Sequence, residues 1–457
     1  MTMRIGILVA VLGIVPALGR GAEYYAAPRP GSGSGTEADP FGLDDLPRVL
    51  AVGRALEVLQ PGDTLYLKGG DYHLKGSKRG EEADAYNHGL ICPVRSGTAE
   101  APITIASAPG EVAHLYGGDA NPVLGTMGRD NRPRNFLRFV GLTVHPNGYQ
   151  PGIRIVRSEG IEIAYCRFLG QYMPTVDNHD GIRLDWAART WIHHTEVAGV
   201  QGDGQNSCSV KMYFSSDTLI EDCYFHDCVS GVYDKRDNPR KILRRCVIMR
   251  CKPPYRGNET RGDGPCSATI EDCIVEGVPY LNGQCTDNQI HDNLIFGEAI
   301  AVGSLPNQTG LAFWNNVLLV PRGTEKVPKV KAIEIRGMPW KPPGEPGAAV
   351  VYLDYNLYAS DAGPAPEVTY EFGVYAPPLK KFDSQSIKRV GLERHSRSVS
   401  GGRAALFERD RMRLRDRWAT AGRDETRPGP DDIEGMLDLS RYGPEARPES
   451  KPATPAP

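Results

Sequence analysis

The 457-residue sequence predicts an all-β solenoid, because a short phrase recurs, the phrase has strand periodicity, and turn-forming residues are abundant. The phrase "TLIEDCYF" at 218–225 returns as "ATIEDCIV" at 268–275 and, more loosely, as "KILRRCVI" and "NQIHDNLIF". Each copy is too short to bury a core alone, so the copies must stack. Apolar and polar residues alternate within each copy, which is the period of a β-strand. The 52 glycines and 37 prolines fit many short strands separated by turns.

One position of the repeat holds cysteine or asparagine in most copies. Successive copies lie 20 to 29 residues apart, with a last step of 40, and the slot residues are Leu142, Cys166, Thr195, Cys223, Cys246, Cys273, Asn293, Asn316 and Asn356. Parallel strands stack about 4.8 Å apart, so residues of one slot form an inward ladder. Thiols pack there as small hydrophobes, and asparagine amides bond the backbone and each other. We expect free, buried thiols in this ladder.

The remaining cysteines divide into two groups. Cys228 and Cys251 each follow a ladder cysteine by five residues and are expected to stack in the same way. Pairing stays open for Cys92, Cys208, Cys266 and Cys285.

The chain ends differ from the repeats in composition. Residues 1–19 combine one arginine, an apolar run and the small-x-small ending Ala17-Leu18-Gly19, which predicts a secretory signal and an exported protein, periplasmic or extracellular, without a membrane span after signal removal. The net charge of −3 gives no general attraction to nucleic acid. The expected divisions are 1–19 signal peptide, 20–60 N-terminal strand and capping helix, 61–360 solenoid, 361–400 C-terminal coil or cap, and 401–457 charged helix and disordered proline-rich tail.

A second short strand precedes the ladder phrase in many copies, as in "GIRI" at 152–155, "GIRL" at 181–184 and "SVKM" at 209–212. With the ladder, this organisation resembles the right-handed parallel β-helix of the pectate-lyase-like superfamily over roughly residues 60–360. The resemblance implies a right-handed parallel β-helix and a carbohydrate-active protein. Apolar residues of 46–59 fall near one face of a helix, which we expect to cap the N-terminal end of the solenoid, and we expect the protein to be a monomer.

The second strand should present polar side chains on the outer face, because the residues on either side of each middle position are apolar. The middle positions are Arg154, Arg183, Lys211 and Tyr233, and the positions two residues further along are Asp185, Tyr213 and Lys235. The segment "VDNHDGIRLD" adds Asp177, His179 and Asp180 to the same edge. We therefore expect a column of cations and tyrosines across successive coils.

Such a column meets the needs of β-elimination in a uronate polysaccharide. The reaction needs a group that neutralises the carboxylate, a base for the adjacent carbon acid, and a proton donor for the leaving oxygen. Arg154 and Arg183 are candidates for binding carboxylates. Lys211, with its pKa lowered by flanking cations, is the candidate base, and Tyr213 or Tyr233 the candidate donor. Lys235, Asp180 and Asp185 complete the expected substrate-binding set.

Two local resemblances refine these roles. "SVKMYFSSDTLIEDCYF" resembles a segment of alginate lyases and chondroitinase B, which implies a lysine base at Lys211 and, approximately, an arginine partner at Arg236. That resemblance also implies calcium, although no matching acidic cluster stands in this sequence. "DNHD" at 177–180 is similar to the Asp-Pro-His-Asp motif of alginate epimerases, which implies a base at His179 and a partner at Tyr172.

The primary expectation is a lyase that cleaves an acidic polysaccharide. A hydrolase of the same fold would need paired carboxylates, for which Asp180 and Asp185, with Asp177, are the candidates. An epimerase and a non-catalytic glycan-binding or surface-structural β-helix are the other readings. The sequence leaves open which polysaccharide is bound, whether calcium is required, and whether the product is unsaturated or epimerised.

Overall fold

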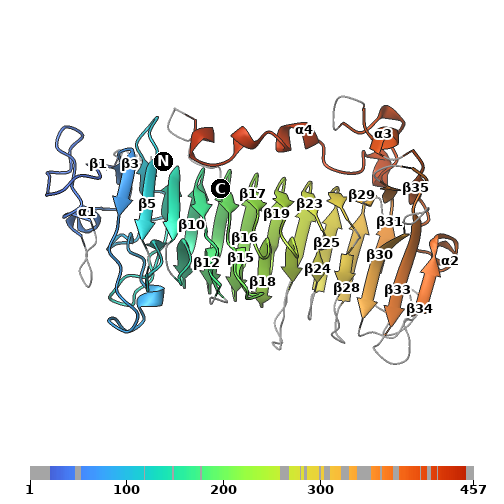
Figure 1. Cartoon of the computed structure of the whole chain (residues 1–457), viewed down its shortest axis with the longest axis horizontal. Helices are drawn as coiled ribbons and strands as arrows, with labels where there is room; N and C mark the ends of the chain where they lie inside the picture. The colour runs from blue at the N-terminus through green and yellow to red at the C-terminus, as the bar shows by residue number, and fades with distance from the viewer. Residues whose placement is uncertain are drawn as a thin grey trace, which may run out of the picture.

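The computed structural model shows a parallel β-solenoid (Figure 1). The structure describes residues 21–46, 53–117, 119–146, 149–174, 178–257, 267–277, 279–281, 286–297, 300–302, 309–320, 329–336, 351–360, 363–373, 380–401, 403–408, 413–418 and 420–448. The expected signal peptide, Asp177, Cys266 and Cys285 lie outside these residues. No helix in the described part of the chain is both long and apolar enough to cross a membrane.

Three sheets form the walls of the solenoid. The first sheet consists of β1 (Glu23–Ala26), β2 (Thr64–Leu67), β4 (Ile103–Ser107), β7 (Leu137–Val140), β10 (Glu159–Ala164), β13 (Ala188–His193), β16 (Ser216–Glu221), β19 (Lys241–Arg244), β22 (Ala268–Glu271), β25 (Thr286–His291), β28 (Thr309–Trp314) and β31 (Val351–Asp354). The second sheet consists of β3 (Gly70–His73), β5 (Ala113–Gly117), β8 (Leu142–Pro146), β11 (Arg167–Leu169), β14 (Glu196–Ala198), β17 (Tyr224–His226), β20 (Val247–Met249), β23 (Ile274–Glu276), β26 (Leu294–Phe296), β29 (Val317–Val320), β32 (Leu357–Ser360) and β35 (Arg397–Val399).

The third sheet carries the predicted polar column. It consists of β6 (Leu124–Gly125), β9 (Ile153–Val156), β12 (Asp180–Asp185), β15 (Cys208–Tyr213), β18 (Val232–Arg236), β21 (Tyr255–Gly257), β24 (Tyr280–Leu281), β27 (Ile300–Val302), β30 (Lys329–Arg336), β33 (Glu367–Gly373) and β34 (Lys380–Asp383). Its strand pairs are parallel except for the last, β33 with β34, which is antiparallel.

Helices are short and lie between or beyond the strands. They are α1 (Arg54–Glu57), α2 (Ser384–Arg389), α3 (Arg403–Leu406) and α4 (Ile433–Met436), with single 3₁₀ turns η1 (Ala85–Asn87), η2 (Asp416–Trp418), η3 (Arg423–Glu425), η4 (Leu439–Arg441) and η5 (Pro444–Ala446). The capping helix expected at 46–59 is described only as α1, because residues 47–52 lie outside the described part.

The slot residues form the predicted ladder at the corner between the first and second sheets. The residue before each slot has a left-handed backbone, with φ of 50° at Asp222, 57° at Asp292 and 56° at Asn315. The backbone N–H of Asn293 donates to Oδ1 of Asn316 at 3.1 Å, and the N–H of Asn316 donates to Oδ1 of Asn356 at 3.0 Å. The side chains thereby satisfy backbone groups that the tight corner leaves without strand partners.

The described cysteines are free and buried, as expected for the ladder thiols. These are Cys92, Cys166, Cys208, Cys223, Cys228, Cys246, Cys251 and Cys273. The thiol of Cys166 donates to the Phe139 carbonyl at 3.4 Å, and burial raises the pKa of this thiol to about 12. The ladder cysteines therefore serve as packing residues rather than as nucleophiles.

The solenoid is longer than the predicted 61–360. β1 pairs in parallel with β2, so the first strand precedes the predicted start. β33 and β35 add parallel strands after residue 360. Residues 20–60 and 361–400 therefore contribute strands to the solenoid. These short strands pair in parallel with strands of the neighbouring coil.

The segment 401–457 was expected to be a charged helix and a disordered proline-rich tail, and the described residues of 413–448 depart from this expectation. They form a C-terminal strap that runs back along the second sheet, drawn in red above the strands in Figure 1. Its attachments include Thr426, which accepts a hydrogen bond from Asn315 at 3.1 Å, and Gly443, whose N–H donates to the His194 carbonyl at 2.9 Å. Only short helical turns occur in the described part of 401–457, since bonds to the solenoid replace those of a helix.

Apolar side chains explain why the strap is ordered. Together with residues just before it, the strap shares one buried cluster with the outward-facing apolar residues of the second sheet: Tyr224, Val247, Ile274, Leu294, Val317, Leu357, Leu406, Phe407, Leu414, Ile433, Met436 and Tyr442. From Cys223 to Asn356, the apolar residue that follows each ladder slot therefore packs in the cluster with the strap, while the next residue along the chain faces the main core.

The ladder predicts different costs for its two residue types. Asn316→Ala should lower the free energy of unfolding by about 3 kcal/mol, because buried backbone groups lose their partners. Cys223→Ala, in the same ladder, removes mainly packing atoms and should cost roughly 1 kcal/mol. Urea denaturation of both variants checks this. Equal costs would contradict the role given to the asparagines.

The strap predicts a contrast between two of its own residues. Met436→Ala should lower the free energy of unfolding by about 3 kcal/mol, because its side chain is buried against the second sheet. Leu439→Ala is the matched control: its side chain is 51% exposed, and its loss should cost under about 0.5 kcal/mol. Thermal and urea denaturation measure both. A similar, small effect of the two variants would show that the strap is not packed on the solenoid.

Candidate functional site

The third sheet brings the predicted middle positions into one column. Arg183 of β12 lies in register with Arg154 of β9 and with Lys211 of β15, and Lys211 lies in register with Tyr233 of β18. The neighbouring core residues, such as Val210 and Met212, are buried in the main core, so the column faces away from that core. Tyr233 is nevertheless completely buried, which corrects the expectation that its ring is outward and available as a proton donor. The prediction of a stacked column is confirmed.

The column continues into coils beyond those expected from the sequence. Tyr233 lies in register with Arg256 of β21, and Arg256 with Tyr280 of β24. The Arg256 guanidinium is 4.5 Å from the centroid of the Tyr233 ring. The pattern Tyr-Arg-Gly at 255–257 has the alternation of the other short strands and could have signalled this continuation.

The second row of the column differs from the prediction by one residue. Asp185 lies in register with Tyr213, but Tyr213 lies in register with Arg236, not Lys235. The register shifts between Met212 and Tyr213, so Lys235 is the additional residue of a β-bulge. Arg236 therefore takes the register position beside Tyr213, and Lys235 is the residue just before it.

Lys211 is buried, which corrects the expectation of an outward, available base. Its side chain is 0% exposed, and Nζ is 2.9 Å from Oδ1 of Asp180 and 3.2 Å from Oδ1 of Asn178. Nζ also donates to the Asn206 carbonyl. Burial alone would lower the pKa of Lys211, but the Asp180 carboxylate outweighs it and raises the pKa above its ordinary value. The expected lowering by cations is thus wrong, because an acid lies nearer than any cation.

Arg154 and Arg183 share one carboxylate. Nε of Arg154 is 2.7 Å from Oδ2 of Asp185, and Nε of Arg183 is 3.0 Å from the same oxygen. Asp185 is buried, and Arg183 also lies 3.7 Å from Asp180. The expected carboxylate-binding arginines are therefore partly engaged by the protein's own acids, which fix the orientation of each guanidinium.

Tyr213 lies between two cations on the accessible side of the column. The Arg183 guanidinium is 4.8 Å from the centroid of its ring, and Nζ of Lys235 is 5.6 Å from it. Lys235 also lies 5.4 Å from the Tyr233 ring centroid. Within the described part of the chain, neither Lys235 nor Arg236 makes an ion pair, and Arg236 is exposed. This part of the face therefore offers positive charge beside an accessible phenol.

His179 lies at the start of β12 and is completely buried. Neither ring nitrogen has a hydrogen-bond partner among the described residues, and burial lowers the pKa of the imidazole. Tyr172, its expected partner, is 57% exposed and donates its hydroxyl to Oδ1 of Asp203 at 2.5 Å. No described contact joins His179 to Tyr172, so the structure does not bring this pair together.

The acids of the column do not fit a calcium site. Calcium binds several oxygen ligands, mostly carboxylates and carbonyls. Here Asp180 is paired with Lys211 and Asp185 with two arginines, so cations already occupy the carboxylates. In the described ranges, no group of three or more His, Cys, Asp or Glu side chains could hold a metal ion.

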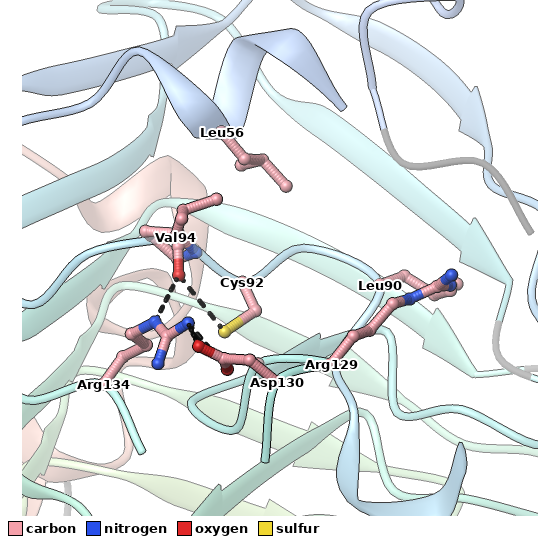
Figure 2. Close-up of a pocket in the computed structure, with 10 residues that line it drawn as sticks. Leu56, Leu90, Cys92, Val94, Arg129, Asp130 and Arg134 are labelled. Carbon is pink, nitrogen blue, oxygen red and sulfur yellow. Dashed lines mark hydrogen bonds and ion pairs between the residues drawn. The ribbon is translucent and has the colours of Figure 1, made fainter. Parts of the chain in front are cut away.

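A small cavity near the N-terminal end is built from structural contacts. It has a volume of about 130 Å³ and lies beside α1, with Leu56, Cys92, Asp130 and Arg134 in its lining (Figure 2). Arg134 pairs with Asp130 at 2.9 Å and donates from Nε to the Pro93 carbonyl at 3.1 Å. Burial raises the pKa of the Cys92 thiol to about 12. The cavity therefore offers no reactive group.

Comparison with known proteins identifies the fold. A family model described as a right-handed β-helix region matches residues 131–311. No curated protein matches the chain significantly. Similar solved structures include pectate lyase Pel9A, with 14% identity, a TM-score of 0.47, and coverage of 71% of this chain and 80% of that one. A rhamnogalacturonan lyase has 13% identity, a TM-score of 0.48, and coverage of 93% and 100%.

A mannuronic acid-specific polysaccharide family 6 lyase from human gut microbiota is a further similar structure. It has 15% identity and a TM-score of 0.43, with coverage of 71% of this chain and 80% of that one. The chain therefore contains a right-handed β-helix region, as the sequence resemblance implied, and the likeness at these identities concerns the fold alone.

The buried ion pair predicts a strong effect of removing its cation. Lys211→Met should lower the free energy of unfolding by about 3–5 kcal/mol, because Asp180 would remain buried without its nearest cation. The double variant Lys211→Met with Asp180→Leu should recover much of this loss. Lys235→Met, on the same face, is the control and should cost under about 0.5 kcal/mol. A cost below 1 kcal/mol for Lys211→Met would contradict the pairing.

The same pair predicts a dependence on alkaline pH. Because the pKa of Lys211 is higher in the folded than in the unfolded chain, its stabilisation is complete below the unfolded value of about 10.4. The stabilisation is then lost as the pH rises through the folded pKa. The difference in unfolding free energy between the wild type and Lys211→Met should therefore narrow above about pH 10.4. A constant difference up to the alkaline limit would contradict the raised pKa.

Proposed function

We propose that this chain is an exported carbohydrate-active protein that binds a uronate-containing polysaccharide along the third sheet and cleaves it by β-elimination. The observation that carries this proposal is the position of Tyr213 between Arg183 and Lys235, with Arg236 in the adjacent coil. Export rests on the signal pattern in residues 1–19.

The exposed cations suit a polymer that carries a carboxylate on each uronate residue. Lys235 and Arg236 have no acidic partner among the described residues, so they can pair with carboxylates of a ligand. Arg183 is held by Asp185 and keeps its guanidinium beside the Tyr213 ring. Parallel coils place these groups one strand spacing apart, which allows a linear polymer to contact several coils at once.

Tyr213 is the proposed acid–base group. The uronate carboxylate is bound by Arg183, Lys235 and Arg236, and its neutralisation lowers the pKa of the adjacent carbon–hydrogen group. The Tyr213 phenolate oxygen takes that proton, a carbon–carbon double bond forms, and the glycosidic carbon–oxygen bond on the neighbouring carbon breaks. The Tyr213 hydroxyl then donates the proton to the leaving oxygen. No net proton is consumed, because the proton taken from the carbon is returned to the leaving oxygen.

Lys211 is proposed to be a positioning residue instead of the base. A lysine that is paired with a carboxylate and completely buried is protonated and out of contact with a polymer. Its bonds to Asn178 and Asn206 fix the two turns that lead into β12 and β15. Lys211 therefore holds β12 and β15 in place through the turns that precede them.

A non-catalytic glycan-binding β-helix is the second candidate. It is favoured by the engagement of Lys211, Asp180 and Asp185 in ion pairs within the protein. The same engagement weighs against a hydrolase, which needs one carboxylic acid and one available carboxylate. His179 is buried and has no described contact with Tyr172, and both observations weigh against the epimerase.

Product absorbance distinguishes these candidates. The mature chain and its Tyr213→Phe variant are mixed with alginate, pectate and chondroitin sulfate, and the ultraviolet absorbance of unsaturated uronate is followed. Loss of the phenol oxygen should lower kcat at least about 100-fold. Tyr352→Phe, an exposed tyrosine on the first sheet, should leave the rate unchanged.

Each outcome of this assay decides between the candidates. A wild-type rate that survives in Tyr213→Phe would show that another group moves the proton. Binding without any unsaturated product from the folded chain would reject elimination and support the glycan-binding candidate.

A further inference from the structure

A polar cleft with aromatic walls adjoins the column at its N-terminal end. It has a volume of about 500 Å³, within the range of small-molecule sites. Its lining comes from four segments of the chain and includes Arg79, Tyr86, Tyr149, Gln150 and Asn178. Two acids also line it, Asp119 and Glu82, and the carboxylate of Glu82 is bonded to Ser77 and His88. Tyr86 is 44% exposed and Tyr149 is 47% exposed, so both rings can contact a ligand.

Two direct contacts connect the cleft to the column. The Arg154 guanidinium lies 4.9 Å from the centroid of the Tyr86 ring and donates from Nη1 to the Tyr86 carbonyl at 2.8 Å. Asn178, at the other side of the cleft, accepts a hydrogen bond from Lys211. The cleft therefore adjoins the column through Tyr86 and Asn178.

The wall that carries Tyr86 is fixed by a buried asparagine. Nδ2 of Asn121 donates to the Ala85 carbonyl at 3.0 Å and to the His88 carbonyl at 3.1 Å. Oδ1 of Asn121 accepts from the Ser77 N–H at 2.7 Å, and the His88 ring lies 2.8 Å from Glu82. Because these bonds hold both sides of the loop, the cleft is formed before a ligand arrives, which reduces the entropic cost of binding.

The lining indicates the class of ligand. Exposed tyrosine rings present an apolar face and a polar hydroxyl, which suits the carbon–hydrogen face and the hydroxyls of a sugar ring. The Arg79 guanidinium lies 5.7 Å from the centroid of the Tyr149 ring, so a cation is held beside one of the two rings. Arginine binds carboxylates through two parallel hydrogen bonds.

We propose that this cleft is a separate subsite that binds one end of an acidic glycan, with Tyr149 and Tyr86 against the sugar rings and Arg79 on a uronate carboxylate. This inference rests on the proposed function and extends it. The cleft sets how far the bound polymer reaches beyond Tyr213, so it acts on long substrates and leaves short ones unaffected.

Affinity electrophoresis in gels that contain alginate, pectate or chondroitin sulfate tests the subsite, because retardation reports binding without any reaction. With the polymer that retards the wild type most, Tyr149→Ala and Arg79→Ala should each raise the dissociation constant about 10-fold. Tyr352→Ala is the matched control, since its ring is exposed on the first sheet away from the cleft, and it should match the wild type. Circular dichroism confirms that each variant is folded.

The results separate the subsite from the reaction. Weaker binding in Tyr149→Ala and Arg79→Ala supports the subsite. A lack of unsaturated product from the wild type would reject elimination but would leave the subsite supported. Wild-type binding in both variants, with loss of binding in a Lys235→Ala and Arg236→Ala double variant, overturns the subsite and leaves the proposed function standing. Absence of retardation of the wild type by all three polymers overturns both.

Discussion

The parallel hydrogen-bond register between coils is the constraint on which the rest of the structure depends. Each residue has the corresponding residue of the next coil about one strand spacing away, so any preference repeated in the sequence becomes a continuous column. Inside, the repeated slot becomes the ladder in which Asn316 bonds its neighbours above and below. Outside, the same rule assembles cations and tyrosines that are separated by 20 residues or more in the chain.

A stack of like charges would repel, and the third sheet resolves this repulsion by dividing its charges into two sets. The cations nearest the sheet are neutralised by buried acids, as Lys211 is by Asp180. Lys235 and Arg236, at the bulge, have no acidic partner among the described residues, and they lie in the coil next to the accessible Tyr213. The buried pairs give rigidity, and the unneutralised pair, Lys235 and Arg236, gives the face its capacity for an acidic ligand.

Features that arise from the repeat, such as the ladder and the column, could be predicted from the sequence. Features that depend on the segments between repeats could not. Strand alternation predicts the ladder and the column, including the stacking of Arg183 on Lys211. Burial of Lys211 was not predicted, because strand alternation does not show that the turns carrying Asn178 and Asn206 fold over the lysine. The bulge at Lys235 is a one-residue insertion that composition does not reveal. The strap was missed because its apolar residues are widely spaced among prolines and charges.

The central claim is that acidic glycans bind across β12, β15 and β18 of the third sheet. Hydrogen–deuterium exchange of the mature chain, with and without saturating polyuronate, tests this most directly. We expect slower exchange in residues 178–186, 206–214 and 231–237, and unchanged exchange in the first-sheet strands β13, β16 and β19 of the same coils. Protection confined to the first sheet or to the strap would contradict it.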